Sequence, residues 1–227
     1  MNDMLPAIEV ETTQNPTFSV IWLHGLGADG SDFEPVVPQL GLDPNPGFRF
    51  IFPHAPSIPV TCNGGYVMPA WYDIISLDST RREADEQGVI RSRGAIRQFI
   101  ARENDRGVPC SRIFLAGFSQ GGAIAYATAL THSEALAGVI ALSTYIPTEK
   151  LIAKEATDPN KVVPIFAAHG TDDDVVAPDL GVRARDFLAG HGYRIEWHEY
   201  SMTHSVCLEE IRDIGGWLKK RLAAASM

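Results

Sequence analysis

The chain has few cysteines, no long apolar run and a shortage of positive charge, and each shortage argues against a class of protein. Its three cysteines are widely spaced and odd in number, which argues against a disulfide framework and predicts a cytoplasmic protein. No run approaches the ~20 apolar residues of a membrane-spanning helix, so we expect no integral membrane association. With 19 Lys and Arg against 28 Asp and Glu, the formal net charge of −9 argues against nucleic acid as a partner.

The remaining composition is that of an ordinary globular protein. The 227 residues, 45% hydrophobic and 21% charged, are enough to bury a substantial core, and they predict a single domain over residues 1–227. The chain contains no internal repeat and no low-complexity segment.

Segments of strand and helix character alternate along the chain. Apolar runs predict strands at 7–10, 18–23, 48–52, 113–116, 138–142, 162–168 and 193–200. Apolar spacing and capping residues predict helices from 31 or 32 to 40 and at 81–104, 121–130, 179–189 and 208–222, with irregular chain at 54–80 and 143–160. The alternation indicates the α/β class, with a mostly parallel twisted sheet, helices on both faces and ligands bound at the carboxyl ends of the strands.

A short motif lies between the strand at 113–116 and the helix that follows it. The segment 117–121, with the sequence GFSQG, matches the G-x-S-x-G turn that exposes a nucleophilic serine between a strand and a helix. Such a corner holds its central residue in a strained conformation, and glycines on both sides let the backbones pass without a Cβ clash. Ser119 is therefore a candidate nucleophile, and the alternative is a glycine-rich turn without chemistry.

Two later loops contain candidate partners for this serine. The loop after the strand at 162–168 contains an acidic trio at 172–174, and the loop after the last strand contains His204, in the order nucleophile, acid, base. The trio also suits a solvated turn or a metal, although no histidine at ligand spacing supports a metal. We expect His24 and His169 to be structural and His198 to be a satisfied side chain in a strand; the remaining histidines, His54, His132 and His191, carry no functional signal.

A glycine-rich loop follows the strand at 18–23 and suits the stabilisation of an oxyanion. Its sequence, HGLG at 24–27, lets the main chain approach a substrate, and the backbone N–H of Leu26 is the natural donor. The backbone N–H of Gln120, directly after the candidate nucleophile at a helix N-terminus, is the second.

Several motifs together resemble the small carboxylesterase and acyl-protein thioesterase (lysophospholipase-like) family. They are WLHGLGAD at 22–29, AWYD at 70–73, FLAGFSQGG at 114–122 and HGTDDDVV at 169–176, within a match from about 19 to 222. ALSTY at 141–145 and DIGGW at 213–217 bring the resemblance closest to the bacterial carboxylesterases of the group. The resemblance implies an α/β-hydrolase fold without a large cap domain, no cofactor and a Ser-Asp-His triad. We expect no metal, because no histidine lies at ligand spacing from the acidic trio.

The resemblance also assigns individual residues. The nucleophile is Ser119, the base is His204, and the acid is Asp173, because the family's aspartate is the fifth residue counted from His169. The oxyanion donors map to Leu26 and Gln120. The resemblance places Trp71, Tyr72 and Ile74 along the acyl groove, whereas from the residues alone Trp71 and Tyr72 suit the core equally well.

These features predict a serine carboxylesterase that hydrolyses short- to medium-chain esters through an acyl-enzyme. The alternatives with the same triad are an acyl-protein thioesterase, a lysophospholipase and an acyltransferase. A ligand-binding protein that keeps the fold without turnover is a remote alternative. The expected partners are a small ester or a lipid-like acyl substrate, or else an acylated protein, and the resemblance makes a homodimer an alternative to a monomer.

Overall fold

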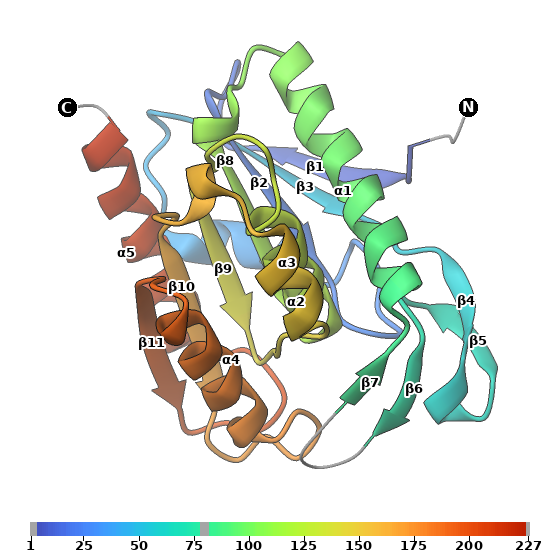
Figure 1. Cartoon of the computed structure of the whole chain (residues 1–227). Coiled ribbons are helices and arrows are strands. Elements are labelled where there is room, and N and C mark those ends of the chain that lie inside the picture. The colour runs from blue at the N-terminus through green and yellow to red at the C-terminus, as the bar shows by residue number, and fades with distance from the viewer. Residues whose placement is uncertain (1–3, 78–81, 226–227) are drawn as a thin grey trace.

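The computed structural model describes residues 4–77 and 82–225 and is built around a seven-stranded sheet with the strand order β1-β3-β2-β8-β9-β10-β11 (Figure 1). Six strands are parallel: β2 (Phe18–Leu23), β3 (Phe48–Pro53), β8 (Ile113–Phe118), β9 (Gly138–Leu142), β10 (Ile165–Gly170) and β11 (Ile195–Tyr200). At one edge, β1 (Ala7–Glu11) pairs antiparallel with β3. The predicted mostly parallel α/β sheet is confirmed.

Helices cover both faces of the sheet (Figure 1). One face is covered by α1 (Glu86–Asp105), α2 (Gln120–Ala129), α3 (Glu149–Glu155) and α4 (Pro178–Gly190). The other is covered by α5 (Leu208–Ala225) and the 3₁₀ helix η1 (Glu34–Leu40). The strand residues alternate between these layers, so Ile21 and Leu23 face α1 and α2 while Val20 and Trp22 face η1 and α5. Strands that are buried on both faces consist of nearly continuous apolar residues, so they could be predicted from apolar runs in the sequence.

The structure corrects two predicted helices. The segment from 31 or 32 to 40 forms no α-helix but the 3₁₀ helix η1, because the ring of Pro38 inside it removes a backbone donor. Helix α1 begins at Glu86 rather than near residue 81, which lies outside the described residues. Asp85 caps it, since its side chain accepts from the backbone N–H of Gln87 at 3.0 Å.

The two segments predicted to be irregular contain regular structure. Residues 54–80 contain a hairpin of β4 (Ser57–Val60) and β5 (Tyr66–Pro69) joined through the 3₁₀ turn η2 (Thr61–Asn63). A second ribbon pairs β6 (Ile74–Leu77) with β7 (Arg82–Ala84). Residues 143–160 contain α3 and the 3₁₀ turn η4 (Asp158–Asn160). Prolines and short lengths hid these elements, because the periodicity of a four-residue strand is barely visible in a sequence.

From the composition we expect no disulfide framework and no membrane-spanning helix. None of the three cysteines, Cys62, Cys110 and Cys207, forms a disulfide bond. Within the described ranges, no helix combines the length and apolar character needed to cross a bilayer.

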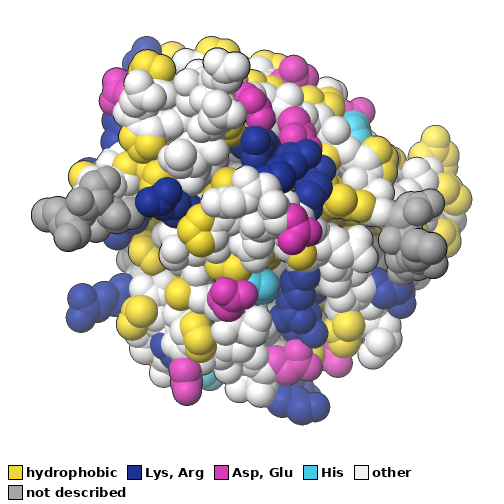
Figure 2. Space-filling model, turned by 90° about the horizontal axis from the view of Figure 1, so that it is seen from above, with side chains coloured by type: hydrophobic (Ala, Val, Ile, Leu, Met, Phe, Trp, Pro, Cys, Tyr) yellow, Lys and Arg dark blue, Asp and Glu magenta, His cyan; other side chains and the backbone are white. Residues whose placement is uncertain are grey.

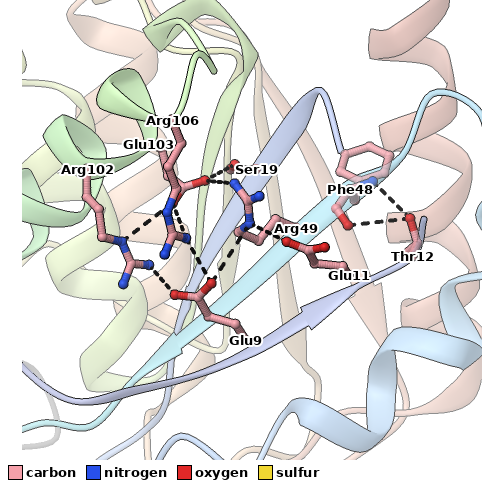
Figure 3. A network of polar contacts seen from close by, with 9 residues as sticks. All are labelled: Glu9, Glu11, Thr12, Ser19, Phe48, Arg49, Arg102, Glu103 and Arg106. Atoms are coloured by element: carbon pink, nitrogen blue, oxygen red, sulfur yellow. Dashed lines mark hydrogen bonds and ion pairs between the residues drawn. The ribbon is translucent and has the colours of Figure 1, made fainter. Parts of the chain in front are cut away.

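A buried ionic network joins α1 to the β1 edge of the sheet (Figure 3). The carboxylate of Glu103, fully buried on α1, accepts from the hydroxyl of Ser19 and from the guanidinium of Arg49, each at 2.7 Å. Burial alone would raise the pKa of Glu103, but these hydrogen bonds and the charges of Arg49 and Arg106 hold it below its ordinary value. Glu103 therefore stays ionised and anchors the end of α1.

We expect Glu103→Gln to lower the free energy of unfolding by about 2–3 kcal/mol, because two hydrogen bonds to a charged acceptor are weakened. A carboxylate with a depressed folded-state pKa stabilises the protein above the unfolded pKa of about 4.3 and loses that contribution as pH falls through the folded pKa. Urea unfolding should therefore show the difference at neutral pH and its loss in acid. Glu11→Gln is the control, because Glu11 is an exposed partner of Arg49 and should contribute less than about 1 kcal/mol.

Candidate active site

The strand-to-helix corner at Ser119 is strained and packed too closely for side chains on either side. Ser119 lies between β8 and α2 with φ 53° and ψ −120°. A Cβ atom on Gly117 would lie 2.4 Å from the carbonyl carbon of Gly121. One on Gly121 would lie 2.3 Å from the carbonyl oxygen of Leu23. Glycine at both positions is therefore a packing requirement, as the motif predicted.

The neighbouring strand β9 holds this corner in place. The backbone N–H of Ser119 donates to the carbonyl of Leu142 at 2.9 Å, and the Thr144 hydroxyl donates to the carbonyl of Ser119 at 2.6 Å. Since both partners lie at or just beyond the end of β9, the strained conformation is stabilised by the sheet itself.

Among the three acidic residues that follow β10, the structure distinguishes Asp173. Asp172 and Asp174 are exposed, whereas Asp173 is buried. Its Oδ2 lies 2.7 Å from Nδ1 of His204, and its Oδ1 accepts from the backbone N–H groups of Val175 at 2.9 Å and Val176 at 2.7 Å. Asp173 and His204, predicted from spacing and resemblance, are thus brought into direct contact.

The hydrogen bonds around Asp173 also set its charge. Burial alone would raise the pKa of this carboxyl, but the hydrogen bond with His204 and those from the backbone hold it below its ordinary value. The ionised carboxylate can only accept a hydrogen bond, so Nδ1 of His204 is the ring nitrogen that donates its N–H to Asp173, and Nε2 is left to face other groups.

Backbone contacts join the acid loop to the histidine loop. Beyond the last rung of β10 and β11, the N–H of Thr171 donates to the carbonyl of Tyr200 at 2.9 Å, and that of Asp172 donates to Met202 at 3.1 Å. The ring of Phe118 lies 4.6 Å from the ring of His204, centroid to centroid. Phe118 directly precedes Ser119, so this contact places the imidazole against the elbow. The sequence had attached no role to Phe118.

The glycine-rich loop after β2 lies against the elbow. A Cβ atom on Gly25 would lie 3.6 Å from Cβ of Ser119. His24 braces this loop, since Nδ1 contacts the carbonyl of Gly25 at 2.7 Å and Nε2 accepts from the N–H of Ala55 at 3.1 Å. Burial lowers the pKa of His24, so the ring is neutral and structural, as expected. His169 is likewise buried with a lowered pKa, and its Nε2 contacts the carbonyl of Val176 at 2.8 Å.

The predicted oxyanion donors face no competing acceptor. Within residues 4–77 and 82–225, no hydrogen bond engages the backbone N–H of Leu26 or that of Gln120. The N–H of Gln120 lies at the start of α2 directly after Ser119, where an unpaired backbone donor suits a developing negative charge.

The side chain of Gln120 has a contact that sequence reasoning missed. This buried amide accepts from the backbone N–H of Trp71 and donates to the carbonyl of Tyr72, each at 2.8 Å. The indole Nε1 of Trp71 donates in turn to the carbonyl of His24 at 2.9 Å. One side chain thus joins the elbow to the 70–73 segment and, through Trp71, to the glycine loop. The only signal in the sequence was its position beside Ser119.

The residues predicted to line the acyl groove lie in the hydrophobic core. Trp71, Tyr72 and Ile74 are all buried, and the Tyr72 hydroxyl bonds to that of Tyr145 at 2.7 Å. Their position agrees with the core alternative for Trp71 and Tyr72, and a role in the acyl groove stays a prediction.

The comparisons with known proteins identify the family. The family model described as Phospholipase/Carboxylesterase matches residues 6–222. The chain belongs to this family. It is 42% identical to a protein of Neurospora crassa named acyl-protein thioesterase 1, over 96% of the chain and 92% of that protein. Among solved structures, Arabidopsis thaliana SOBER1 gives a TM-score of 0.85 at 34% identity, covering 90% of this chain and 99% of that one. Zea mays acyl-protein thioesterase 2 gives 0.84 at 25% identity, covering 96% and 99%.

The family membership confirms the α/β-hydrolase fold and makes the chain an ester hydrolase of the carboxylesterase and thioesterase type. One part of the predicted resemblance is not supported, namely that it is closest to bacterial carboxylesterases. The curated relatives in Neurospora crassa, Yarrowia lipolytica and Saccharomyces cerevisiae are fungal proteins named acyl-protein thioesterase 1. The segments at 141–145 and 213–217, on which that part of the resemblance rested, do not separate the bacterial branch from these fungal relatives.

We expect Gly121→Ala to destabilise the protein by at least about 3 kcal/mol in urea unfolding, because the added methyl group meets a backbone carbonyl that cannot move aside. Esterase activity should fall about a hundredfold as the corner shifts. Gly94→Ala is the matched control, since Gly94 lies on the exposed side of α1 with nothing within 4 Å of its Cβ position. It should gain about 0.5–1 kcal/mol. Equal stabilities for both variants would contradict the packing described above.

Gln120→Met keeps the length of the side chain and removes both of its hydrogen bonds. Because the buried N–H of Trp71 loses its acceptor, we expect a loss of about 1–3 kcal/mol in unfolding free energy. A lower kcat/KM should accompany it as the glycine loop loosens. Gln98→Met, on the exposed side of α1, should stay within about 0.5 kcal/mol of the parent protein. An unchanged kcat/KM in Gln120→Met would mean that the bridge does not position the site.

Proposed function

We propose that the chain, as one α/β-hydrolase domain over residues 1–227, is a serine hydrolase that cleaves acyl thioesters on proteins. The observation that carries the catalytic part is the 2.7 Å contact between Asp173 and His204 next to the strained corner at Ser119. The substrate class is supported by the 42% identity with a protein named acyl-protein thioesterase 1, over almost the whole of both chains.

In the proposed first half-reaction, the Ser119 hydroxyl attacks the carbonyl carbon of the thioester. Nε2 of His204 accepts the hydroxyl proton, while Asp173 holds the imidazole in the required tautomer and stabilises the imidazolium. The tetrahedral intermediate then collapses, the C–S bond breaks, and His204 returns the proton to the leaving thiol. The product of this step is an acyl-enzyme on Ser119.

In the second half-reaction, water takes the place of the serine hydroxyl. His204 removes a proton from the water as its oxygen attacks the acyl carbonyl, and then returns that proton to Oγ of Ser119 as the carboxylic acid leaves. In both halves, the N–H groups of Leu26 and Gln120 stabilise the oxyanion, each by about 3 kcal/mol.

The second candidate function is the hydrolysis of short- to medium-chain carboxylic esters. The same residues perform it, because an alkoxide leaving group accepts the proton from His204 as a thiolate does. The description of the family as Phospholipase/Carboxylesterase supports this second candidate. A lysophospholipase differs from both in the acyl groove alone. The cytoplasmic location, the lack of a cofactor and the alternative of a homodimer stay predictions.

Hydrolysis of a palmitoylated cysteine peptide, compared with p-nitrophenyl esters from acetate to palmitate, distinguishes these activities. We expect a higher kcat/KM on the thioester, and a loss of about 10⁴-fold or more on every substrate in Ser119→Ala. Ser111→Ala is the control, because this exposed serine lies beyond the other end of β8.

The results test the substrate class and the catalytic role of Ser119 separately. Highest activity on short esters would replace the thioesterase proposal by the carboxylesterase one. Activity that survives Ser119→Ala, or no labelling of Ser119 by a fluorophosphonate, would overturn the catalytic proposal and revive a binding role.

A further inference from the structure

Three side chains with metal-binding atoms converge at the end of the sheet opposite Ser119. Cys110 begins the 3₁₀ turn η3 (Cys110–Arg112), which leads into β8, while His132 and Glu134 follow the end of α2. One ligand atom from each of the three lies within 4.8 Å of the others. Among the described residues, no other group of three such side chains meets this criterion. The sequence had attached no signal to His132, because 22 residues separate it from Cys110.

The distance between the two buried members of this cluster fits a tetrahedral metal ion. Sγ of Cys110 lies 3.6 Å from Nε2 of His132. Zinc–sulfur and zinc–nitrogen bonds at the tetrahedral angle separate the two ligand atoms by about 3.5 Å. A hydrogen bond between a thiol and an imidazole has a similar length. A third ligand is therefore needed to distinguish a metal site from a hydrogen-bonded pair. Glu134 offers a carboxylate oxygen within 4.8 Å of the other two ligand atoms, from an exposed side chain.

The backbone of the 132–136 turn is held rigidly. The fully buried side chain of Asn160 donates to the carbonyl of His132 at 2.9 Å and to that of Glu134 at 2.8 Å. Its amide oxygen accepts from the N–H of Leu136 at 3.0 Å. On the other side of the cluster, Nδ2 of Asn104 lies 3.2 Å from Sγ of Cys110. Such surroundings pre-orient ligands and stabilise a thiolate once a cation is bound.

The cluster combines two buried ligand atoms, Sγ of Cys110 and a ring nitrogen of His132, with one exposed carboxylate. The cluster opens to solvent on the side of Glu134. Figure 2 looks down on this end of the sheet and shows acidic and basic side chains interspersed on its surface.

We propose that Cys110, His132 and Glu134 bind one zinc-type divalent cation, with water from the open side as the fourth ligand. A thiolate, an imidazole and a carboxylate in tetrahedral geometry are typical of zinc. The strand β8 runs for six residues from this cluster to Ser119, a separation of about 20 Å. The cation therefore takes no part in acyl transfer, and it clamps the start of β8 to the end of α2.

Titration of the full-length, chelator-treated protein with Co²⁺ and Zn²⁺ tests this site. One equivalent of Co²⁺ should produce the thiolate-to-cobalt charge-transfer absorption, and Zn²⁺ should abolish it by displacement. Cys110→Ser should lose the absorption, whereas Cys62→Ser, which alters a half-buried cysteine elsewhere, should keep it. In Glu134→Gln, Co²⁺ and Zn²⁺ should bind at least about tenfold more weakly, the effect that even outer-shell substitutions have on metal sites.

A thermal measurement provides the second readout. Zn²⁺ should raise the Tm of the parent protein and of Cys62→Ser, because a cation that binds only the folded state stabilises it. The rise should be smaller in Glu134→Gln. Failure of the parent protein to bind Co²⁺ through a thiolate would reduce the cluster to a hydrogen-bonded pair. If Cys110→Ser does not fold, unchanged affinity in Glu134→Gln would overturn the three-ligand site, since this exposed substitution leaves the core intact.

Discussion

The candidate site depends on one close approach of backbones, where α2 passes over the end of β2. Gly121 lies so near the carbonyls of Leu23 and His24 that no larger residue fits, and this contact brings the start of the helix against the glycine-rich loop. The positive φ of Ser119 follows from it, because the chain must reverse within one residue to make the contact. The start of α2, with the unpaired N–H of Gln120, owes its position to this packing.

The candidate acid and base, Asp173 and His204, are placed by a second constraint, the parallel order of β9, β10 and β11. Loops that leave neighbouring parallel strands meet at one edge of the sheet, and here they exchange backbone hydrogen bonds beyond the last rung. The histidines near the site differ in burial and in their hydrogen-bond partners. His24 and His169 are neutral and hold main chain, whereas His204 is paired with the ionised carboxylate of Asp173. Two histidines thus hold the main chain around the candidate site, and the third contacts the candidate acid Asp173.

The fold could be predicted largely from the sequence, with characteristic exceptions. The buried strands of the sheet appeared as apolar runs, and the longer helices as apolar periodicity. The failures were short or proline-containing elements, namely η1, the β4–β5 hairpin, the β6–β7 ribbon and α3. Their stability comes from the surfaces on which they pack rather than from their own periodicity, so the local sequence carries little trace of them.

For the site, the sequence by itself determined the serine elbow, its glycines and the chain order of the candidate nucleophile, acid and base, because these depend on local geometry and chain order. Tertiary structure decided what depends on contacts between distant segments. It buried Asp173 and left its two acidic neighbours exposed, placed Gln120 as a bridge to Trp71, and brought Cys110 to His132. Sequence spacing cannot reveal such contacts, since they arise only when strands and helices far apart in the chain pack side by side.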